Sequence, residues 1–303
     1  MKPQESLIVS LYQSRHLDED GVVHALSSLD GLCCVPFLEK LVVECCKQRH
    51  LDALRTCLSI SGITLPDETL ERCIRICILQ QQPDVATIVV ASLCSYRREL
   101  DAALTALLLW ICRQKKDTRN RTFAALLSML LEQNLVDVSA SDNLAFRTAC
   151  QSGNREIVQL LLRDPRVDPS ALQNHALRDA CAHDHASIVA DLLQDERVDP
   201  SDMSQIALHD ALLHRSHSTL GILLKDKRVD PSVCGVVYVE HMIAQGEYDR
   251  CILLTLLNDK RVAFSRQHLQ CIVEHLLGQS SDVCITSCVH NSIGQPGLID
   301  RNR

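Results

Sequence analysis

The pentapeptide Arg166-Val167-Asp168-Pro169-Ser170 decides the fold, because the chain repeats it twice at a constant spacing of 31 residues. It recurs as Arg197-Val198-Asp199-Pro200-Ser201 and as Arg228-Val229-Asp230-Pro231-Ser232. Degenerate copies occupy 136–139 and 261–265. Self-similarity at a period of roughly 20 to 50 residues is typical of repeat arrays. We therefore interpret residues 136–265 as a tandem array.

Each unit of the array predicts two short helices joined by a polar turn. The first helix carries small residues, as at Ala180-Cys181, and the second places apolar residues at helical spacing, as at Ile188-Val189 and Leu192-Leu193. Between units, proline fixes φ and prevents the helix from continuing. Because so short a helix pair cannot bury its own apolar face, neighbouring units have to stack. The pattern predicts an all-α helical-repeat solenoid.

This unit resembles the ankyrin repeat. Ala180-Cys181 corresponds to the Ala-Ala of the family's first helix, Asp184-His185 to its Gly-His turn, and Ile188-Val189 with Leu192-Leu193 to its second-helix stripe. His175-Ala176-Leu177-Arg178 replaces the family's Thr-Pro-Leu-His, and the period is 31 instead of about 33 residues. The resemblance implies an ankyrin-type fold over 136–265.

The rest of the chain gives weaker signals. The segments 45–54 and 78–88 resemble part of the repeat, so we expect 1–135 to consist of degenerate, ankyrin-like helix pairs. A separate helical cap is the competing interpretation of that region. For 266–303 the polar composition predicts a capping helix followed by a frayed tail.

Composition excludes several classes of protein. The chain has 303 residues, a net charge of −7 and 46% apolar residues, which is too apolar for intrinsic disorder. Only 10 Gly and nine aromatic residues are present, as 1 Trp, 4 Tyr and 4 Phe. This scarcity disfavours β folds, glycine-rich phosphate loops and base-stacking surfaces, so we do not expect a nucleic-acid partner.

Targeting signals are weak. The longest apolar stretch, 102–112, is far shorter than the about 20 residues that span a bilayer, so we expect a buried core helix and no membrane association. No signal-peptide pattern follows the first residues, which favours the cytoplasm. The basic residues between Arg113 and Arg121 would suit a nuclear-localisation patch, but a solvated loop is the favoured interpretation.

Sixteen cysteines raise the question of metal or redox chemistry. We expect most of them, including Cys33-Cys34, Cys45-Cys46, Cys73 and Cys77, to be reduced core residues. Cys284, Cys288 and His290 have the most metal-like spacing, but no second ligand pair complements them. We therefore expect no metal, no cofactor, no catalytic residues and no enzyme. A Cys/His-based metal-binding or redox-sensing protein is the alternative.

The repeated arginines permit two interpretations. Arg166, Arg197, Arg228 and Arg261 would form a ladder that could bind acidic groups of a partner. Alternatively, the neighbouring Asp residues neutralise the arginines, the following Val packs in the core, and Pro-Ser starts the next helix. We favour the structural interpretation, because the uniform positions of a repeat protein build the stack and the variable ones bind.

The ankyrin resemblance also implies which residues face the partner. Carried onto this chain they are Thr148 and Gln151, Asp179 and His183, Asp210 and His214, and His241 and Gln245, with Ser152, Ala182, Leu213 and Ala244 in the same stripe. Segment 136–303 holds 16 Lys+Arg against 22 Asp+Glu, a net charge of −6. We expect a monomeric, non-enzymatic protein–protein interaction module or scaffold whose concave surface binds a basic or polar peptide surface. Partner identity does not follow from the fold.

Overall fold

The computed structural model describes residues 8–9, 12, 18–28, 35–59, 65–94, 101–115, 120–245, 249–270 and 272. Within these residues the regular structure is entirely α-helical, which confirms the predicted all-α class. The chain divides into two compact units, Met1–Ala140 and Ser141–Arg303. None of the helices described is both long enough and apolar enough to cross a membrane.

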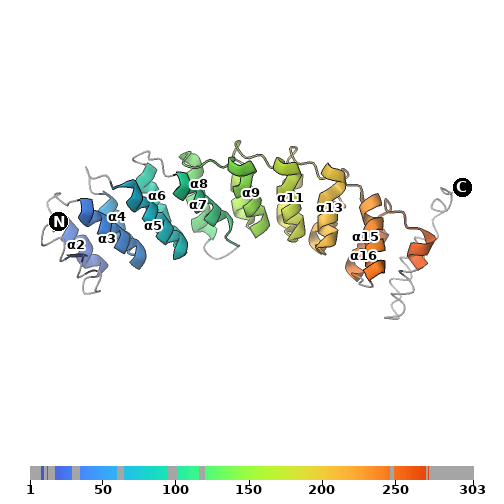
Figure 1. Ribbon diagram of the computed structural model, residues 1–303, viewed down its shortest axis with the longest axis horizontal. Coiled ribbons are helices and arrows are strands. Elements are labelled where there is room, and N and C mark those ends of the chain that lie inside the picture. The colour runs from blue at the N-terminus through green and yellow to red at the C-terminus, as the bar shows by residue number, and fades with distance from the viewer. Residues whose placement is uncertain are drawn as a thin grey trace. The chain divides into compact units, whose positions relative to one another are not determined.

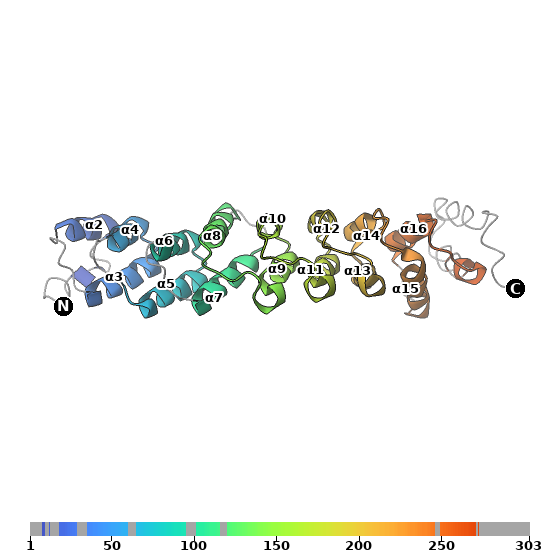
Figure 2. The same cartoon turned by 90° about the horizontal axis from the view of Figure 1, so that it is seen from above.

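The first unit is built from helices that alternate between two rows (Figures 1 and 2). They are α2 (Glu19–Ser28), α3 (Val35–Gln48), α4 (Leu51–Ser59), α5 (Asp67–Leu79), α6 (Pro83–Cys94), α7 (Asp101–Cys112) and α8 (Asn120–Glu132). Helix α5 packs between α3 and α7, and α6 packs between α4 and α8. The apolar stretch predicted as a core helix is α7, with Leu107 and Ile111 fully buried. Of the basic residues, Arg113 and Lys115 are exposed after α7, whereas Arg121 lies within α8.

The second unit repeats the same alternation at the 31-residue period. Its helices are α9 (Ala140–Ser152, with all but the first residue in this unit), α10 (Arg155–Leu162), α11 (Ala171–Ala182), α12 (Ala186–Leu193), α13 (Asp202–Leu213), α14 (His217–Leu223), α15 (Pro231–Gln245) and α16 (Arg250–Asn258). Helix α13 packs between α11 and α15, and α14 packs between α12 and α16. We call α9, α11, α13 and α15 the first helices, and α10, α12, α14 and α16 the second helices; Figure 2 shows them as two rows.

The apolar stripe of the repeat forms the core. Ile188, Val189 and Leu192 are completely buried, whereas Leu193 is half-buried. The small residues Ala180 and Cys181 are also completely buried, on the first helix of the same repeat. Close approach at these small side chains lets neighbouring helices pack together and exclude water from the stripe.

The connectors join each repeat to the one before it. Arg197 Nη1 donates to the backbone carbonyl of Val167 at 2.8 Å, and Arg228 Nη1 to that of Val198 at 2.9 Å. Each arginine also pairs with the aspartate two residues earlier, as Arg228 does with Asp226 at 2.7 Å. The valines are buried. These contacts confirm two parts of the structural interpretation, the pairing of each arginine with its neighbouring aspartate and the packing of the valines in the core.

The start of three first helices, α9, α11 and α13, differs from the sequence-based expectation, whereas α15 begins at Pro231 as expected. We expected Pro-Ser to begin the helix, but Leu172, Gln173 and Asn174 have left-handed φ values of 53°, 59° and 56°. The same turn recurs at 141–143 and 203–205. Left-handed backbone costs about 1–2 kcal/mol for each non-glycine residue. Asn174 offsets part of this cost, because its Oδ1 accepts a hydrogen bond from the Asp199 amide of the next connector at 3.2 Å.

Candidate partner-binding surface

The eight residues implied by the ankyrin resemblance lie on or just after the first helices, at the 31-residue period except for Gln151, which is one position earlier than His183, His214 and Gln245 in their repeats. They are Thr148 and Gln151 on α9, Asp179 on α11, His183 after it, Asp210 on α13, His214 after it, and His241 and Gln245 on α15. Gln151, His183, His214, His241 and Gln245 are exposed, whereas Thr148, Asp179 and Asp210 are half-buried.

The two carboxylates of this set are already engaged within the chain. Asp210 Oδ2 accepts a hydrogen bond from Arg178 Nε at 3.0 Å, and only 18% of the Asp210 side chain is exposed. Asp179 Oδ2 lies 3.0 Å from Nδ1 of His175 on the same helix. Since Arg178 belongs to α11, its ion pair with Asp210 fastens α11 to α13. These carboxylates are therefore poorer contacts for a basic partner than the sequence alone indicates.

His183 is also held by neighbouring groups. Its Nδ1 lies 2.9 Å from the backbone oxygen of Asp179, and its ring stacks on that of His185 with the ring centroids 5.9 Å apart. His185 Nε2 in turn lies 3.0 Å from the Gln151 carbonyl oxygen of the previous repeat. This part of the predicted stripe thus serves the stacking of repeats.

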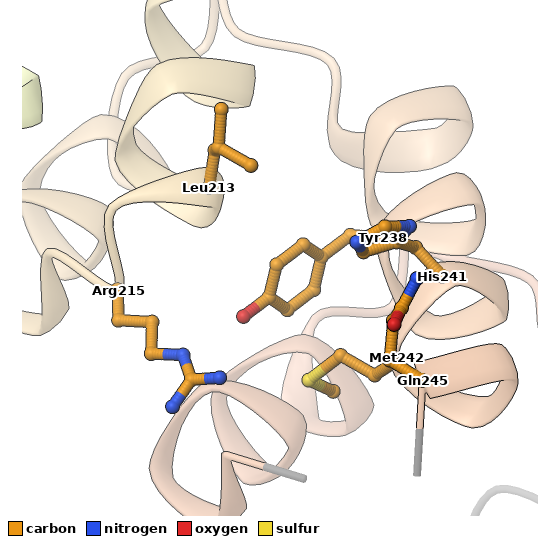
Figure 3. A pocket seen from close by; sticks show the side chains of 6 residues that line it. All are labelled: Leu213, Arg215, Tyr238, His241, Met242 and Gln245. Atoms are coloured by element: carbon orange, nitrogen blue, oxygen red, sulfur yellow. The ribbon is translucent and has the colours of Figure 1, made fainter. Parts of the chain in front are cut away.

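An apolar hollow opens between α13 and α15, lined in part by Leu213, Val237 and Tyr238. Figure 3 shows its continuation, which shares Leu213, Tyr238 and His241 with it. Leu213 is 54% exposed and Val237 is 53% exposed, and both line the same hollow. Exposed apolar side chains that lie together are informative, whereas single ones are common on protein surfaces. In Figure 3 the ring of Tyr238 extends from α15 into the space beside Leu213 and Arg215. The hollow and its continuation are lined by His209, Leu213, Arg215, Val237, Tyr238, His241, Met242 and Gln245. We call this set the α13–α15 hollow.

Tyr238 gives the hollow a polar end. Burial raises the pKa of Tyr238, and the charge of Asp249 raises it further while Arg215 opposes the change. The phenol is therefore neutral at pH 7 and can donate a hydrogen bond. An apolar ring with a hydroxyl tip suits a surface that is apolar at its centre and polar at its rim.

The structure brings only part of the predicted stripe to this hollow. His241 and Gln245 line it, as does Leu213 between Asp210 and His214. Sequence reasoning missed Val237 and Tyr238. They stand in the apolar run 236–239, which resembles a segment buried on all sides, and only the position of α13 shows which of these side chains remain uncovered.

The cysteines that we expected in the core are there. Cys45, Cys46, Cys73 and Cys77 have no exposed surface. Hydrogen bonds with Cys73 and Cys77, together with burial, raise the pKa of the Cys46 thiol. Since the thiolate is the reactive form, this group is a poor nucleophile. Cys33-Cys34 and the cluster of Cys284, Cys288 and His290 lie outside the described residues.

Comparison of the chain with models of known families, with curated proteins and with solved structures finds no match.

Proposed function

We propose that the protein is a non-enzymatic interaction module, an ankyrin-type helical-repeat solenoid that binds a partner protein through its first helices. The repeated bonds from Arg197 and Arg228 to carbonyls of the preceding connector support the stacked architecture. The turn between paired helices has a residue of positive φ in both units, which supports ankyrin-type repeats in the first unit as well. Arg49 and Gln81 have positive φ between their helices, as do Gly153, Asp184 and Arg215 between theirs.

The observation that carries the proposal is the exposure of Leu213 and Val237 in one hollow. Removal of apolar surface from water contributes about 25 cal/mol per Å² before the cost of association is subtracted. Side chains that fill central, desolvated pockets carry most of the binding energy at protein interfaces. His241 and Gln245 lie beside the same hollow and supply hydrogen-bonding groups at its rim. The arrangement fits the insertion of one apolar side chain of a partner.

The partner that we propose is a polypeptide segment with an apolar residue flanked by basic residues. Segment 136–303 has a net charge of −6, which attracts a basic segment and speeds its association. Arg178 compensates the charge of Asp210, so the field arises mainly from the other acidic residues of this segment. A surface built on packed helices needs little reordering, which lowers the cost of binding.

Panning a displayed peptide library against the full chain tests this proposal. We expect enrichment of peptides with an apolar residue beside Lys or Arg. Leu213→Glu and Val237→Glu are each expected to weaken binding of the selected peptides at least about tenfold, or about 1.4 kcal/mol. Leu79→Glu is the matched control, since Leu79 is 81% exposed and lies on α5 in the first unit. Equal binding by the three variants, with unchanged circular dichroism, would contradict the proposal.

A further inference from the structure

A histidine, an aspartate and a cysteine converge among the second helices of the second unit. His217 is the first residue of α14, Asp249 immediately precedes α16, and Cys251 is the second residue of α16. One ligand atom of each residue lies within 4.8 Å of the other two. We propose that His217, Asp249 and Cys251 bind one zinc ion. This site shares no residue with the α13–α15 hollow, although it borders that hollow: the Asp249 amide donates to Sδ of Met242, a lining residue, at 3.5 Å.

One of the three ligand–ligand distances already suits a tetrahedral zinc site. Zinc lies about 2.0–2.3 Å from nitrogen, oxygen and sulfur ligands, which sets ligand atoms roughly 3.3–3.7 Å apart. His217 Nε2 and Asp249 Oδ2 are already 3.3 Å apart. Cys251 is exposed, so rotation of its side chain can bring Sγ to the same distance without disturbing the core.

The backbone of α16 orients the aspartate. Asp249 Oδ1 accepts hydrogen bonds from the amides of Cys251 at 3.1 Å and Ile252 at 3.2 Å. These bonds hold the carboxylate in place while its other oxygen, Oδ2, faces His217. Only 12% of the Asp249 side chain is exposed. Outer hydrogen bonds of this kind fix metal ligands and strengthen binding.

The donor set selects the metal. A thiolate and an imidazole favour zinc and related transition metals over magnesium or calcium, which take oxygen ligands. The Cys251 thiol loses its proton to solvent when the metal binds, and the thiolate with the Asp249 carboxylate balances the charge of Zn²⁺. Three protein ligands leave a fourth position for water, which is accessible because the His217 side chain is 47% exposed.

Binding would link α14 to α16, which belong to successive repeats. A ligand that binds only the folded state raises the stability of that state by mass action. Zinc is therefore expected to raise the melting temperature of the chain. The apolar contacts of α14 and α16 do not depend on the metal, because Leu220, Leu223 and Ile252 are buried without it. The repeats should therefore remain folded in its absence.

Titration of the chelator-treated full chain with Co²⁺ and Zn²⁺ tests the site. Co²⁺ bound to a thiolate absorbs in the near ultraviolet, and Zn²⁺ should displace it. We expect Cys251→Ser and His217→Ala each to bind one equivalent less than the parent chain and to lose the zinc-dependent rise in melting temperature. Asp249→Asn keeps the hydrogen-bond acceptor at the start of α16 and should weaken zinc binding at least about tenfold.

Two control variants exclude other thiols. Cys234→Ser removes a half-buried cysteine of the same unit outside the cluster, and Cys284→Ser removes one outside the described residues. Both control variants are expected to keep the one equivalent of bound zinc that Cys251→Ser loses. Equal zinc stoichiometry and equal melting-temperature shifts in Cys251→Ser, His217→Ala and the parent chain would overturn the proposal. The proposal would also be overturned if Cys284→Ser lost one equivalent of bound zinc while Cys251→Ser retained it.

Discussion

Arg228 donates a hydrogen bond from Nη1 to the backbone carbonyl of Val198, 2.9 Å away and 30 residues earlier in the chain. Its Nη2 reaches a second carbonyl, that of Leu193, at 2.9 Å. Arg261 makes the equivalent pair of bonds one repeat later, to Val229 and Leu224. One guanidinium thus satisfies two carbonyls of the preceding repeat while Asp226 or Asp259 holds it in place.

Replacing this arginine tests its structural role. Arg228→Lys keeps the charge, but a single ammonium group cannot reach both carbonyls and Asp226 in the same geometry. We expect the free energy of unfolding to fall by about 1–2 kcal/mol, measured by urea denaturation. Lys227→Met, at an exposed neighbouring position, is the control and should change little. An unchanged denaturation midpoint for Arg228→Lys would show that the bonds to Val198 and Leu193 contribute nothing.

Gly153 and His185 form a second link between repeats. Gly153 has φ of 81°, and a Cβ atom there would lie 2.5 Å from the His185 ring. We expect Gly153→Ala to lower the free energy of unfolding by about 1–3 kcal/mol, and His185→Ala to recover part of that loss. Gly221→Ala is the matched control: it meets nothing within 4 Å, lies in α14 and should stabilise the chain by up to about 1 kcal/mol. If the effects of Gly153→Ala and His185→Ala on the free energy of unfolding were strictly additive in the double variant, a direct clash between these two positions would be contradicted.

The left-handed turns provide a prediction of increased stability. Asn143 and Asn174 accept hydrogen bonds from the amides of Asp168 and Asp199, but the third turn has Gln205 in this place. The buried Oε1 of Gln205 has no hydrogen-bond partner among the described residues. Gln205→Asn should bring the oxygen to the Asp230 amide and raise the free energy of unfolding by about 0.5–1.5 kcal/mol.

The reverse substitution at an occupied turn is the control for this prediction. Asn174→Gln should lower the free energy of unfolding, because it withdraws the acceptor from the Asp199 amide. Thermal and urea denaturation measure both variants. We expect the two substitutions to change the stability in opposite directions. If Gln205→Asn lowered the free energy of unfolding as much as Asn174→Gln does, the length of the side chain at the last position of the left-handed turn would have no specific role.

The connectors also predict a pH dependence. Hydrogen bonds from Arg166, Arg197, Arg228 and Arg261 lower the pKa of Asp164, Asp195, Asp226 and Asp259, against the opposing effect of burial. A carboxylate whose pKa is depressed by folding contributes stability above its unfolded pKa of about 3.9, and this contribution is lost as the pH falls through the folded value.

We therefore expect the connector carboxylates to contribute equally to stability at pH 7 and pH 5 and to lose this contribution below about pH 4. Comparison of Asp226→Asn with the parent chain isolates one of them. The difference in free energy of unfolding between the two proteins should be constant at pH 7 and 5 and should shrink below about pH 4. A difference that already shrinks between pH 7 and pH 5 would contradict the assignment.

The sequence predicts the parts of the fold that depend on the repeat period, but not those that depend on contacts between repeats. Val198 and Leu192 were predicted to be buried because the 31-residue period and the helical spacing place them in every unit. The left-handed turn at 172–174 was not predicted, since Leu-Gln-Asn contains no glycine and resembles the start of a helix. Its bond to Asp199 exists only once the next repeat has stacked.

The candidate sites depend even more on packing. Asp210 was correctly placed on a first helix, but its pairing with Arg178 requires the distance between α11 and α13. Val237 is visible as a surface residue only when α13 is in place beside α15. His217 and Cys251 are more than a full repeat apart in sequence, so no local spacing indicates that their side chains meet.

We propose that the α13–α15 hollow receives an apolar side chain of a partner polypeptide. The most direct test is photo-crosslinking of a library-selected peptide that carries a photoreactive group at its apolar residue, followed by mass spectrometry of the adduct. We expect crosslinks to Leu213, Val237 or Tyr238, and we expect these crosslinks to be lost in Leu213→Glu. Crosslinks concentrated on the second helices, at 186–193 or 217–223, or on the first unit, would contradict it.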